Sequence, residues 1–378
     1  MFNKSSIDHV NYDVLDRAKN AFIAASQSTA RFAERYGFIP PSGFGASANI
    51  FSLDLKPFLK QKNSQLYITL LPEGLGTSDD ARPDDLSEKQ LERFWHHIGI
   101  KTVAVMTNDA ASTGMQTVLI SLYLPSGTPE LVFNPVFMKG FLKGFVEGCK
   151  TVGCVYFSGE TPQLKNKIYP GKLDIAGALF GLMPAGASPI DGTTLAAGDK
   201  IVFIESSGPH DNGFTSLRQL AERLPKGYHT ELPGGREYWE AILSPTILYT
   251  PFIQDLLRAG LHPSNVEPIT GHGWQKLMRS RKPFRYVIHD TLPVPEVFQF
   301  IQKEAALTTE QMIKIFNYGV GLAVFIKGDA EATRVVQIAR KNGLKAVVAG
   351  EVEVSKAREV VVEPWKIILS GEWFALKQ

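Results

Sequence analysis

Short apolar runs and longer amphipathic segments alternate along this chain, and their lengths indicate which become strands and which become helices. Runs of four to eight apolar residues have the length of buried strands, whereas apolar residues at three- and four-residue spacing are typical of a helix with one buried face. We expect helices over residues 13–36, 98–111 and 135–152, and a further helix from about Thr215. We expect strands over residues 66–71, 117–124, 154–157, 174–182 and 200–205.

Strands and helices are mixed without strict alternation, which favours an α+β fold over a doubly wound sheet. The chain has 378 residues, enough for two or three domains. Residues 185–198 are rich in Ala, Gly, Pro and Thr and form the best candidate for a domain boundary. We predict an N-terminal domain over residues 1–186 and a C-terminal domain over residues 197–378. Residues 78–88 are polar and acidic, and they predict an exposed loop.

The predicted helix at residues 135–152 carries Gly140, Gly144 and Gly148 at four-residue spacing. In a membrane, this spacing would indicate a pair of closely packed helices. Charged residues such as Lys143 and Glu147 interleave with the glycines, so we expect close packing on a sheet in a soluble protein.

Composition and charge exclude several classes of protein. The formal net charge is +2, so no broad electrostatic field attracts nucleic acid or anionic lipid. The longest apolar runs have strand length, well short of the ~18 residues of a membrane span, and the first residues lack the apolar core of a signal peptide. The two cysteines, Cys149 and Cys154, make no disulfide framework. We expect them to be buried thiols in a cytoplasmic protein.

Residues 206–213 follow a predicted strand and precede a predicted helix, and they carry the most informative polar pattern of the chain. Backbone N–H groups at a helix start, with glycines that let a ligand approach the main chain, are well suited to bind an anion. His210 can hold or pass a proton near neutral pH. From these residues alone, an ordinary turn with a surface histidine is the simpler interpretation.

Carboxylates near glycine turns recur at several predicted strand or helix ends. Glu73 begins a glycine turn over residues 73–77, Asp109 ends an apolar run, and Glu160 lies within residues 158–161. Oxygen ligands of this kind suit magnesium, which usually bridges to phosphate. Each carboxylate taken alone is more simply a turn or cap residue. The prediction of a metal site therefore depends on how many such turns occur together, and in what order.

The order of these segments resembles that of the aminoimidazole ribonucleotide synthetase family, also called the phosphoribosylformylglycinamidine cyclo-ligase family. The resemblance covers nearly the whole chain, and no single motif decides it. The matching segments are residues 43–45, 73–77, 98–109, 147–161, 174–177, 206–213, 245–249, 269–273 and 316–321. Nine segments in the family's order make coincidence an unsatisfactory explanation, and several altered positions mark a divergent member.

The resemblance implies a two-domain fold in which the N-terminal domains pair across a homodimer, so that their strands close a β-barrel, with a C-terminal α/β domain beside it. It implies a cytoplasmic ligase of purine biosynthesis that uses ATP and magnesium on a small ribonucleotide substrate. ATP phosphorylates the formyl oxygen of formylglycinamidine ribonucleotide, a nitrogen then attacks, and phosphate leaves as the imidazole ring closes. The protein must position the reactants, neutralise phosphate charge and exclude water.

The resemblance also assigns roles to residues of this chain. His210, Asn212 and Asp109 would act at the reacting centre, and Asp109 and Glu73 would hold the metal. The substrate would be bound by Ser206, Ser207, Gly208 and Gly213. The nucleotide would be bound by Glu73, Gly74, Gly76, Thr77, Lys101, Asn108, Glu160, Gly271, Gly273 and Asn317.

Several positions depart from the family's pattern. Where the family has Asp-Gly-Val-Gly-Thr-Lys, this chain has Glu73 first and Ser78 last, and Lys101 replaces an aspartate. Ser158 and His272 each replace a glycine. In one account, Lys101 stands in for the missing lysine while Glu73 and Asp109 still hold magnesium. In the other account, ATP handling is weakened or lost. Convergence of Asp109, Glu160 and Lys101 on one cleft would support the first account, which we favour.

Two other functions stay open from the sequence. One is a non-catalytic or regulatory relative that binds a nucleotide without turnover. The other is an ATP-dependent kinase of the same superfamily, which would phosphorylate its substrate without closing a ring.

Overall fold

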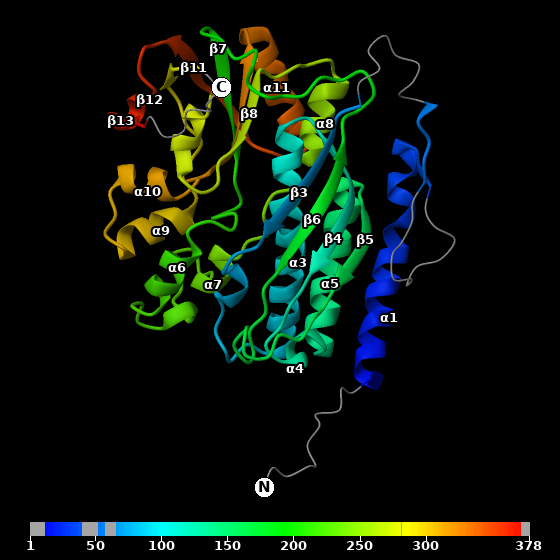
Figure 1. The fold of residues 1–378 in the computed structure, drawn as a ribbon. Helices are drawn as coiled ribbons and strands as arrows, with labels where there is room; N and C mark the ends of the chain where they lie inside the picture. The colour runs from blue at the N-terminus through cyan, green and yellow to red at the C-terminus, as the bar shows by residue number, and fades with distance from the viewer. Residues whose placement is uncertain (1–11, 40–51, 57–65, 281, 372–378) are drawn as a thin grey trace.

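The computed structural model describes residues 12–39, 52–56, 66–280 and 282–371. Within these ranges the chain forms a four-stranded sheet, a seven-stranded sheet and a two-stranded sheet of β1 (Phe38–Ile39) and β2 (Ser52–Leu53). Helices and strands are mixed in both halves of the molecule (Figure 1), which confirms the α+β prediction. The segment 43–45 lies outside the described residues.

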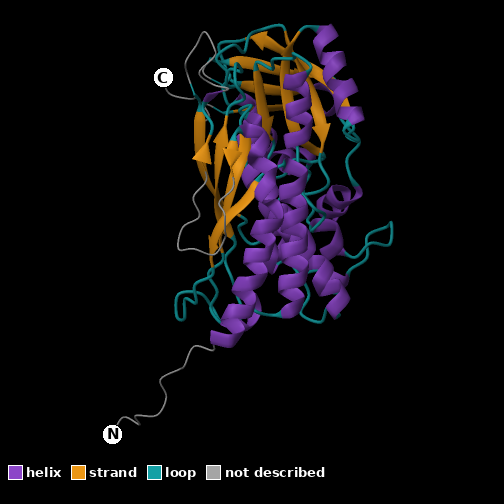
Figure 2. Ribbon diagram, turned by 90° about the vertical axis from the view of Figure 1, so that its right-hand side faces the viewer, coloured by secondary structure: helices purple, strands orange, loops and turns teal. Residues whose placement is uncertain are grey.

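The four-stranded sheet belongs to the first half of the chain and has the order β3-β6-β4-β5. Its strands are β3 (Ile68–Gly74), β4 (Gln116–Tyr123), β5 (Val155–Glu160) and β6 (Ala176–Leu182). β4 and β5 are parallel, and the other neighbours are antiparallel. Two long helices, α3 (Glu88–Ser112) and α5 (Pro135–Val152), cover one face of this sheet (Figures 1 and 2).

The seven-stranded sheet belongs to the second half and has the order β13-β12-β9-β11-β7-β10-β8. Its strands are β7 (Asp199–Glu205), β8 (Asn265–Pro268), β9 (Phe284–Ile288), β10 (Val320–Lys327), β11 (Ala346–Val354), β12 (Glu359–Val362) and β13 (Ile367–Ser370). β7 and β10 are buried along nearly their whole length, which explains their continuous apolar sequences. Helices α8 (Thr250–Arg258) and α11 (Asp329–Lys341) pack with these strands in one hydrophobic cluster.

The remaining helices are short apart from α1. They are α1 (Tyr12–Thr29), α4 (Pro129–Val132), α6 (Phe214–Ala221), α7 (Tyr238–Ile242), α9 (Glu296–Glu304) and α10 (Thr309–Ile315), with 3₁₀-helices at Ala30–Tyr36, Ser78–Asp80, Gly227–His229, Gly273–Met278 and Glu363–Trp365. We call Ser78–Asp80 η2 and Gly273–Met278 η4 below. α6, α7, α9 and α10 lie together to the left of α3 in Figure 1.

Several predicted elements have the expected bounds, and two segments differ. The helix at residues 135–152 is found as α5 without any change. The helix expected from residue 98 begins ten residues earlier, because Ser87 and Gln90 form a capping box at its start. The prediction of an exposed loop over residues 78–88 is wrong at its beginning, because Ser78 and Asp79 are buried in η2. The first sheet ends at Leu182 and the second begins at Asp199, while the domain limits themselves stay a prediction.

The glycines of α5 pack against a helix, which corrects the expectation that they pack on a sheet. A Cβ atom at Gly140 or Gly144 would overlap a backbone carbonyl of α3, and one at Gly148 would lie 2.9 Å from Val103 of α3. Gly99 of α3 meets the backbone of α5 in the same way. Small residues on both helices therefore let the two backbones approach more closely than larger side chains would allow.

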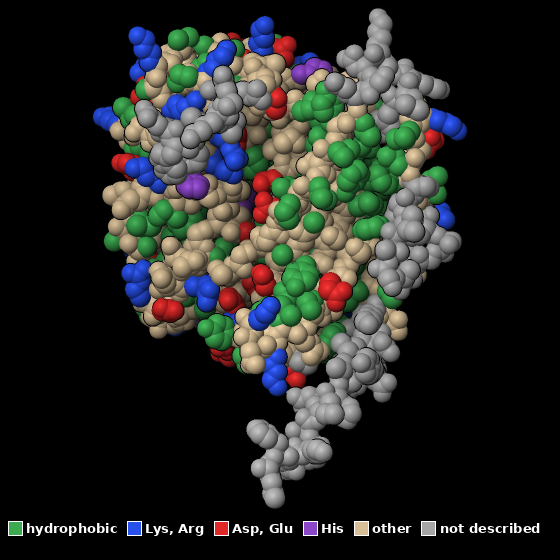
Figure 3. Space-filling view, in the orientation of Figure 1, with side chains coloured by type: hydrophobic (Ala, Val, Ile, Leu, Met, Phe, Trp, Pro, Cys, Tyr) green, Lys and Arg blue, Asp and Glu red, His purple; other side chains and the backbone are tan. Residues whose placement is uncertain are grey.

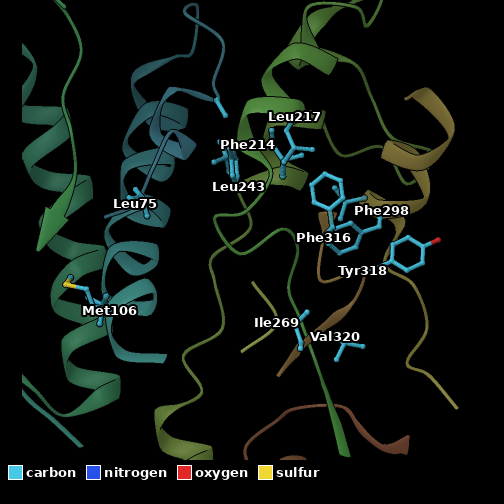
Figure 4. Close-up of a cluster of buried hydrophobic side chains, with 14 of the residues drawn as sticks. Leu75, Met106, Phe214, Leu217, Leu243, Ile269, Phe298, Phe316, Tyr318 and Val320 are labelled. Carbon is cyan, nitrogen blue, oxygen red and sulfur yellow. The ribbon is translucent and has the colours of Figure 1, made fainter. Parts of the chain in front are cut away.

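The hydrophobic core is continuous between the two halves of the chain. One cluster of buried side chains includes Leu75 and Met106 of the first half together with Phe214, Ile269 and Phe316 of the second (Figure 4). The halves therefore share buried apolar surface and do not meet only through a linker. Within the described ranges, no helix is long and apolar enough to cross a membrane.

The packing of α3 on α5 makes a prediction about Gly144. Replacing glycine by alanine in the middle of a helix ordinarily stabilises it by up to ~1 kcal/mol. Gly144→Ala should instead lower the free energy of unfolding by about 1–3 kcal/mol, because the added methyl group overlaps the His96 carbonyl oxygen. Urea unfolding should be compared with Lys143→Ala, which changes the exposed neighbouring residue of the same helix. A Gly144→Ala protein as stable as that control would contradict the packing.

Candidate functional site

The loop between β7 and α6 has a strained and tightly fastened backbone. His210 and Asp211 have φ angles of 51° and 65°, in the left-handed region that few non-glycine residues adopt. The buried Asn317 holds the loop from the side, because its Oδ1 accepts a hydrogen bond from Ser206 Oγ (2.7 Å) and its Nδ2 donates to the carbonyl of Gly208 (2.8 Å). Asn317 and Ser206 therefore fix the loop's shape.

His210 is buried beneath this loop, so the surface histidine of the simpler interpretation is not found. Its Nε2 accepts a hydrogen bond from the backbone N–H of Ser207 (3.0 Å), which places the proton of the neutral ring on Nδ1. Burial, and secondly the positive charge of Lys101, lower the pKa of His210 to about 3. The imidazole is therefore neutral at physiological pH and holds Ser207 in place. It is a poor carrier of protons near neutrality.

Lys101 forms a buried ion pair with the same loop. Its Nζ lies 3.0 Å from Asp211 Oδ1, and the side chains are 0% and 4% exposed. Asp211 also accepts hydrogen bonds from Ser78 Oγ and Thr246 Oγ1, both at 2.8 Å. The cation at position 101 therefore has a local counterion and two further hydrogen bonds around it, as a buried charge requires. Ser78 takes part in the same network.

A second contact between the halves fixes the end of α3. Asn108 Oδ1 accepts a hydrogen bond from the backbone N–H of Tyr249 (2.9 Å), and its Nδ2 donates to the carbonyl of Ile247 (2.8 Å). The side chain of Asn108 thus joins α3 to the segment before α8, and its contact with a nucleotide stays a prediction. The next residue, Asp109, thereby has a fixed place at the junction.

Charged side chains of both signs meet beyond Asn108, in a group that we call the junction cluster. Its members come from β3, α3, β8 and the region of η4, and they are Glu73, Asp109, Glu267, Lys276 and Arg279. Among the residues that the structure describes, none of the five has an oppositely charged atom within 4 Å. On the face drawn in Figure 3, acidic side chains also gather along a hollow between the two halves.

Burial shifts the pKa values of Glu73, Asp109, Glu267 and Lys276 toward the neutral forms. The pKa of Glu267 rises to about 7, chiefly because the side chain is buried. Burial also raises the pKa of Asp109, and burial together with the charge of Asp109 raises that of Glu73. Burial lowers the pKa of Lys276. These four shifts have the direction expected of charges that are partly withdrawn from water and have no close ion pair among the described residues.

The junction cluster contains two of the predicted site residues and three that the sequence interpretation missed. Glu73 and Asp109 come together as expected, although the roles assigned to them stay predictions. Glu267, Lys276 and Arg279 were missed, because each follows or interrupts an apolar segment with no motif of its own. The available signal was a charged residue within the short strand before Thr270, and two cations three residues apart after Gly273.

Glu160 and Lys101 do not join Asp109, so the expected convergence of these three residues is not found. Glu160 is exposed and shares a rung of the first sheet with Tyr123, Ala176 and Gly74. It therefore lies at the same end of the sheet as the junction cluster but three strands away, on the order of 14 Å. Lys101 is enclosed with Asp211, so the account in which it replaces the missing lysine is wrong.

The glycine turns bring the predicted loops close to one another. A Cβ at Gly271 would lie 3.5 Å from Asn212 Oδ1, so residues 206–213 and 269–273 are neighbours. Gly273 has a φ of 54°, and its Cα packs against the carbonyl of Ile313. Gly213 likewise has a positive φ and packs against Phe316. The remaining predicted positions, Gly74, Gly76 and Thr77, form the exposed turn between β3 and η2.

A magnesium ion fits the carboxylates of the junction cluster only together with a ligand. Within the described ranges, no group of three or more His, Cys, Asp or Glu residues could hold a metal ion by itself. Magnesium is often bound by one or two carboxylates and completed by phosphate oxygens and water. Glu73 and Asp109 provide carboxylates of that kind.

Sequence comparison relates this chain to a known family. Residues 85–183 match the family described as "AIR synthase related protein, N-terminal domain". The chain is 29% identical over 334 residues to a phosphoribosylformylglycinamidine cyclo-ligase of Anaeromyxobacter dehalogenans, which covers 85% of this chain and 89% of the relative. It is 30% identical over 303 residues to the protein of the same name from Rippkaea orientalis, with coverage of 78% and 86%.

Solved structures share the fold at lower sequence identity. HypE of E. coli, a hydrogenase maturation protein, has a TM-score of 0.62 at 18% identity and covers 95% of this chain and 97% of its own. Thiamine-monophosphate kinase of Stenotrophomonas maltophilia has a TM-score of 0.60 at 16% identity, with coverage of 92% and 97%. A HypE in complex with ATP has a TM-score of 0.57 at 15% identity, with coverage of 86% and 92%. These likenesses show a common architecture.

The buried ion pair makes a prediction about stability. Lys101→Met leaves Asp211 without its counterion, so the free energy of unfolding should fall by about 3–5 kcal/mol. Lys101→Met combined with Asp211→Asn should recover part of this loss, because asparagine carries no charge, its Oδ1 can accept from one of the two hydroxyls, and its Nδ2 can donate to the other. Chemical unfolding of both single variants and the double variant gives the coupling energy. A loss below ~0.5 kcal/mol for Lys101→Met would show that the pair contributes little.

The environment of His210 makes a prediction about pH. The folded-state pKa of about 3 lies below that of the unfolded chain, near ~6.5. Below that value the unfolded chain binds the proton more readily, so this contribution to stability is lost as the pH falls from ~6.5 toward 3. Histidine NMR, with the His210 signal assigned by its absence in His210→Gln, should show a neutral ring down to pH ~4. His229, whose pKa is raised by Asp85 and Glu237, serves as the comparison within the same protein. An ordinary midpoint for His210 would contradict its burial.

Proposed function

Because this chain belongs to the phosphoribosylformylglycinamidine cyclo-ligase family, we propose that it closes the imidazole ring of formylglycinamidine ribonucleotide with ATP. The observation that carries the proposal is the junction cluster. Five charged residues of both signs converge from four elements and lie next to the loops that resemble the family's motifs. Within the described part of the chain, none of them forms a close ion pair. A bound phosphate with its magnesium would complement both sets of charges.

In the proposed reaction, the γ-phosphoryl group of ATP passes to the formyl oxygen of the substrate, and ADP is released. The neighbouring nitrogen then attacks the formyl carbon, the carbon–oxygen bond breaks, and inorganic phosphate leaves. The nitrogen gives up a proton, and the ring is closed. Phosphorylation is needed because an amide-like oxygen is a poor leaving group, and its phosphate ester is a much better one.

The protein's part in this reaction is to bind, orient and enclose. Glu73 and Asp109 would hold magnesium, which neutralises phosphate charge when bound. Residues 206–213 would orient the substrate, with Asn212 at the side facing Gly271. His210 would act as a positioning residue through Ser207, because its low pKa makes it a weak base near neutral pH.

A homodimer is part of the proposal and is supported by an apolar surface on the first sheet. Ile68 and Leu70 of β3 are 58% and 76% exposed, and Tyr123 of β4 is 43% exposed. The strand pairing places these three side chains on the face of the sheet away from α3 and α5. Figure 3 shows hydrophobic side chains gathered over this region. A second copy of the chain would cover the face and complete the barrel that the family resemblance implies.

Nucleotide binding without ring closure is the second candidate. The observation that favours it is the position of Glu160, which lies about three strands from the junction cluster in a single chain. A kinase or a regulatory protein would still use the same cluster for phosphate, as the shared architecture of the kinase and the ATP-bound HypE suggests.

Phosphate release from ATP tests the proposal. The wild-type protein should release phosphate only when formylglycinamidine ribonucleotide is present, and Asp109→Asn should reduce the rate at least ~100-fold through loss of a metal ligand. Lys143→Ala, an exposed change on α5, is the control and should retain the wild-type rate.

The outcomes of this assay separate the two candidates. Release that ignores the ribonucleotide would contradict the cyclo-ligase and favour a kinase or a hydrolase. ATP binding without any release would favour the regulatory relative. A wild-type rate in Asp109→Asn would remove the junction cluster from the reaction.

A further inference from the structure

The two cations of the junction cluster come from one short segment with a fixed position. Trp274, 1% exposed, donates a hydrogen bond from Nε1 to the carbonyl of Asn317 (2.9 Å), which fastens η4 to the loop before β10. Gly273 begins η4 with a positive φ and packs against the carbonyl of Ile313. The side chain of Lys276 then folds back and donates a hydrogen bond to Thr270 Oγ1. Lys276 is therefore held over the glycine turn of residues 270–273.

The charge of Lys276 has no close counterion among residues 12–39, 52–56, 66–280 and 282–371, in contrast to that of Lys101. Lys101 is fully enclosed and paired with Asp211 at 3.0 Å. Lys276 is partly buried, and its acidic neighbours Asp109, Glu267 and Glu73 act on it from beyond ion-pair distance. A partly desolvated ammonium without a close counterion is unfavourable, and an anion that completes its coordination removes that cost.

We propose that Lys276, assisted by Arg279, binds the β- and γ-phosphate oxygens of the nucleotide in this chain. This inference rests on the proposed function, because it concerns the same site. The carboxylates at Glu73 and Asp109 would face the divalent cation, while the ammonium and guanidinium groups would face the phosphate oxygens. The segment 270–273 lies beside Asn212, so the terminal phosphate would lie next to the substrate loop.

This placement also explains why Ser78 and Lys101 can serve other purposes. In the resemblance described above, a lysine is expected where this chain has Ser78. Here Ser78 donates to Asp211, and Lys101 neutralises Asp211. The cation that binds phosphate is then supplied from η4, in the other half of the chain, and the first glycine turn needs no lysine.

Calorimetry with Mg·ATP, Mg·ADP and AMP tests the assignment of Lys276. Lys276→Gln keeps a donor for Thr270 but removes the charge, and it should raise the Kd for Mg·ATP at least ~10-fold, which corresponds to ~1.4 kcal/mol. The Kd for AMP should change less than ~3-fold, because AMP lacks the phosphates concerned. Lys276→Arg should restore part of the affinity for Mg·ATP. Lys303→Gln, a change at an 83% exposed lysine, is the control for loss of charge.

The outcomes distinguish this inference from the proposed function. If the wild type binds Mg·ATP and Lys276→Gln binds it as tightly as Lys303→Gln, the assignment of Lys276 is overturned while the proposed function stands. If the wild type binds no Mg·ATP at millimolar concentration, the proposed function fails, and this assignment fails with it. If thermal unfolding shows that Lys276→Gln is not folded, Arg279→Gln, a change at an exposed residue, gives the same comparison. We expect it to raise the Kd for Mg·ATP at least ~3-fold.

Discussion

The arrangement of the site depends on how helix α3 is fixed against the second half of the chain. Lys101 and Asn108 lie two turns apart on this helix, and each is bonded to a different segment of the other half. The first bond is a buried charge pair, which tolerates little displacement because separation would leave both charges desolvated. The second is a pair of hydrogen bonds to backbone groups, which fixes rotation of the helix about its axis. Together they determine where Asp109 is presented and how the two sheets face one another.

The same charge pair limits the chemistry of the loop between β7 and α6. A cation close to His210 adds to the effect of burial on its pKa and keeps the imidazole neutral. Histidine often transfers protons, but here His210 holds the backbone of the loop in place. The strained backbone at His210 and Asp211 also indicates that the loop is held in one shape. Left-handed conformations at two successive non-glycine residues are unfavourable alone and persist because the surrounding bonds hold them. The loop is thus preorganised, which suits a reaction that depends on positioning more than on proton transfer.

The sequence predicted local features well and contacts between distant segments less well. Helix α5 was predicted with its observed bounds, because Pro135 after a capping asparagine begins it and Gly153 in a left-handed conformation ends it. The prediction that its glycines pack on a sheet was wrong, because they pack on α3. The spacing of the glycines indicates a face of small residues but does not indicate which element covers it. Lys101 was misassigned for a related reason. Its counterion is 110 residues away in the chain, and only the fold brings Asp211 to it. The sequence analysis missed Glu267, Lys276 and Arg279. Each indicates a site only together with the other charged residues, and the fold is what brings them together.

Phosphate recognition depends on where a positive charge lies in space, and several elements around the junction could supply it. A lysine on the first glycine turn and a lysine on η4 would both lie near the junction cluster, because Glu73 and Lys276 interact electrostatically. Once η4 supplies the cation, position 78 is released from that requirement and can take a hydroxyl that bonds to Asp211. That aspartate in turn allows a lysine at position 101, which would otherwise be an unpaired buried charge. Two of the altered positions, Ser78 and Lys101, are therefore electrostatically connected through Asp211, so neither can be interpreted alone.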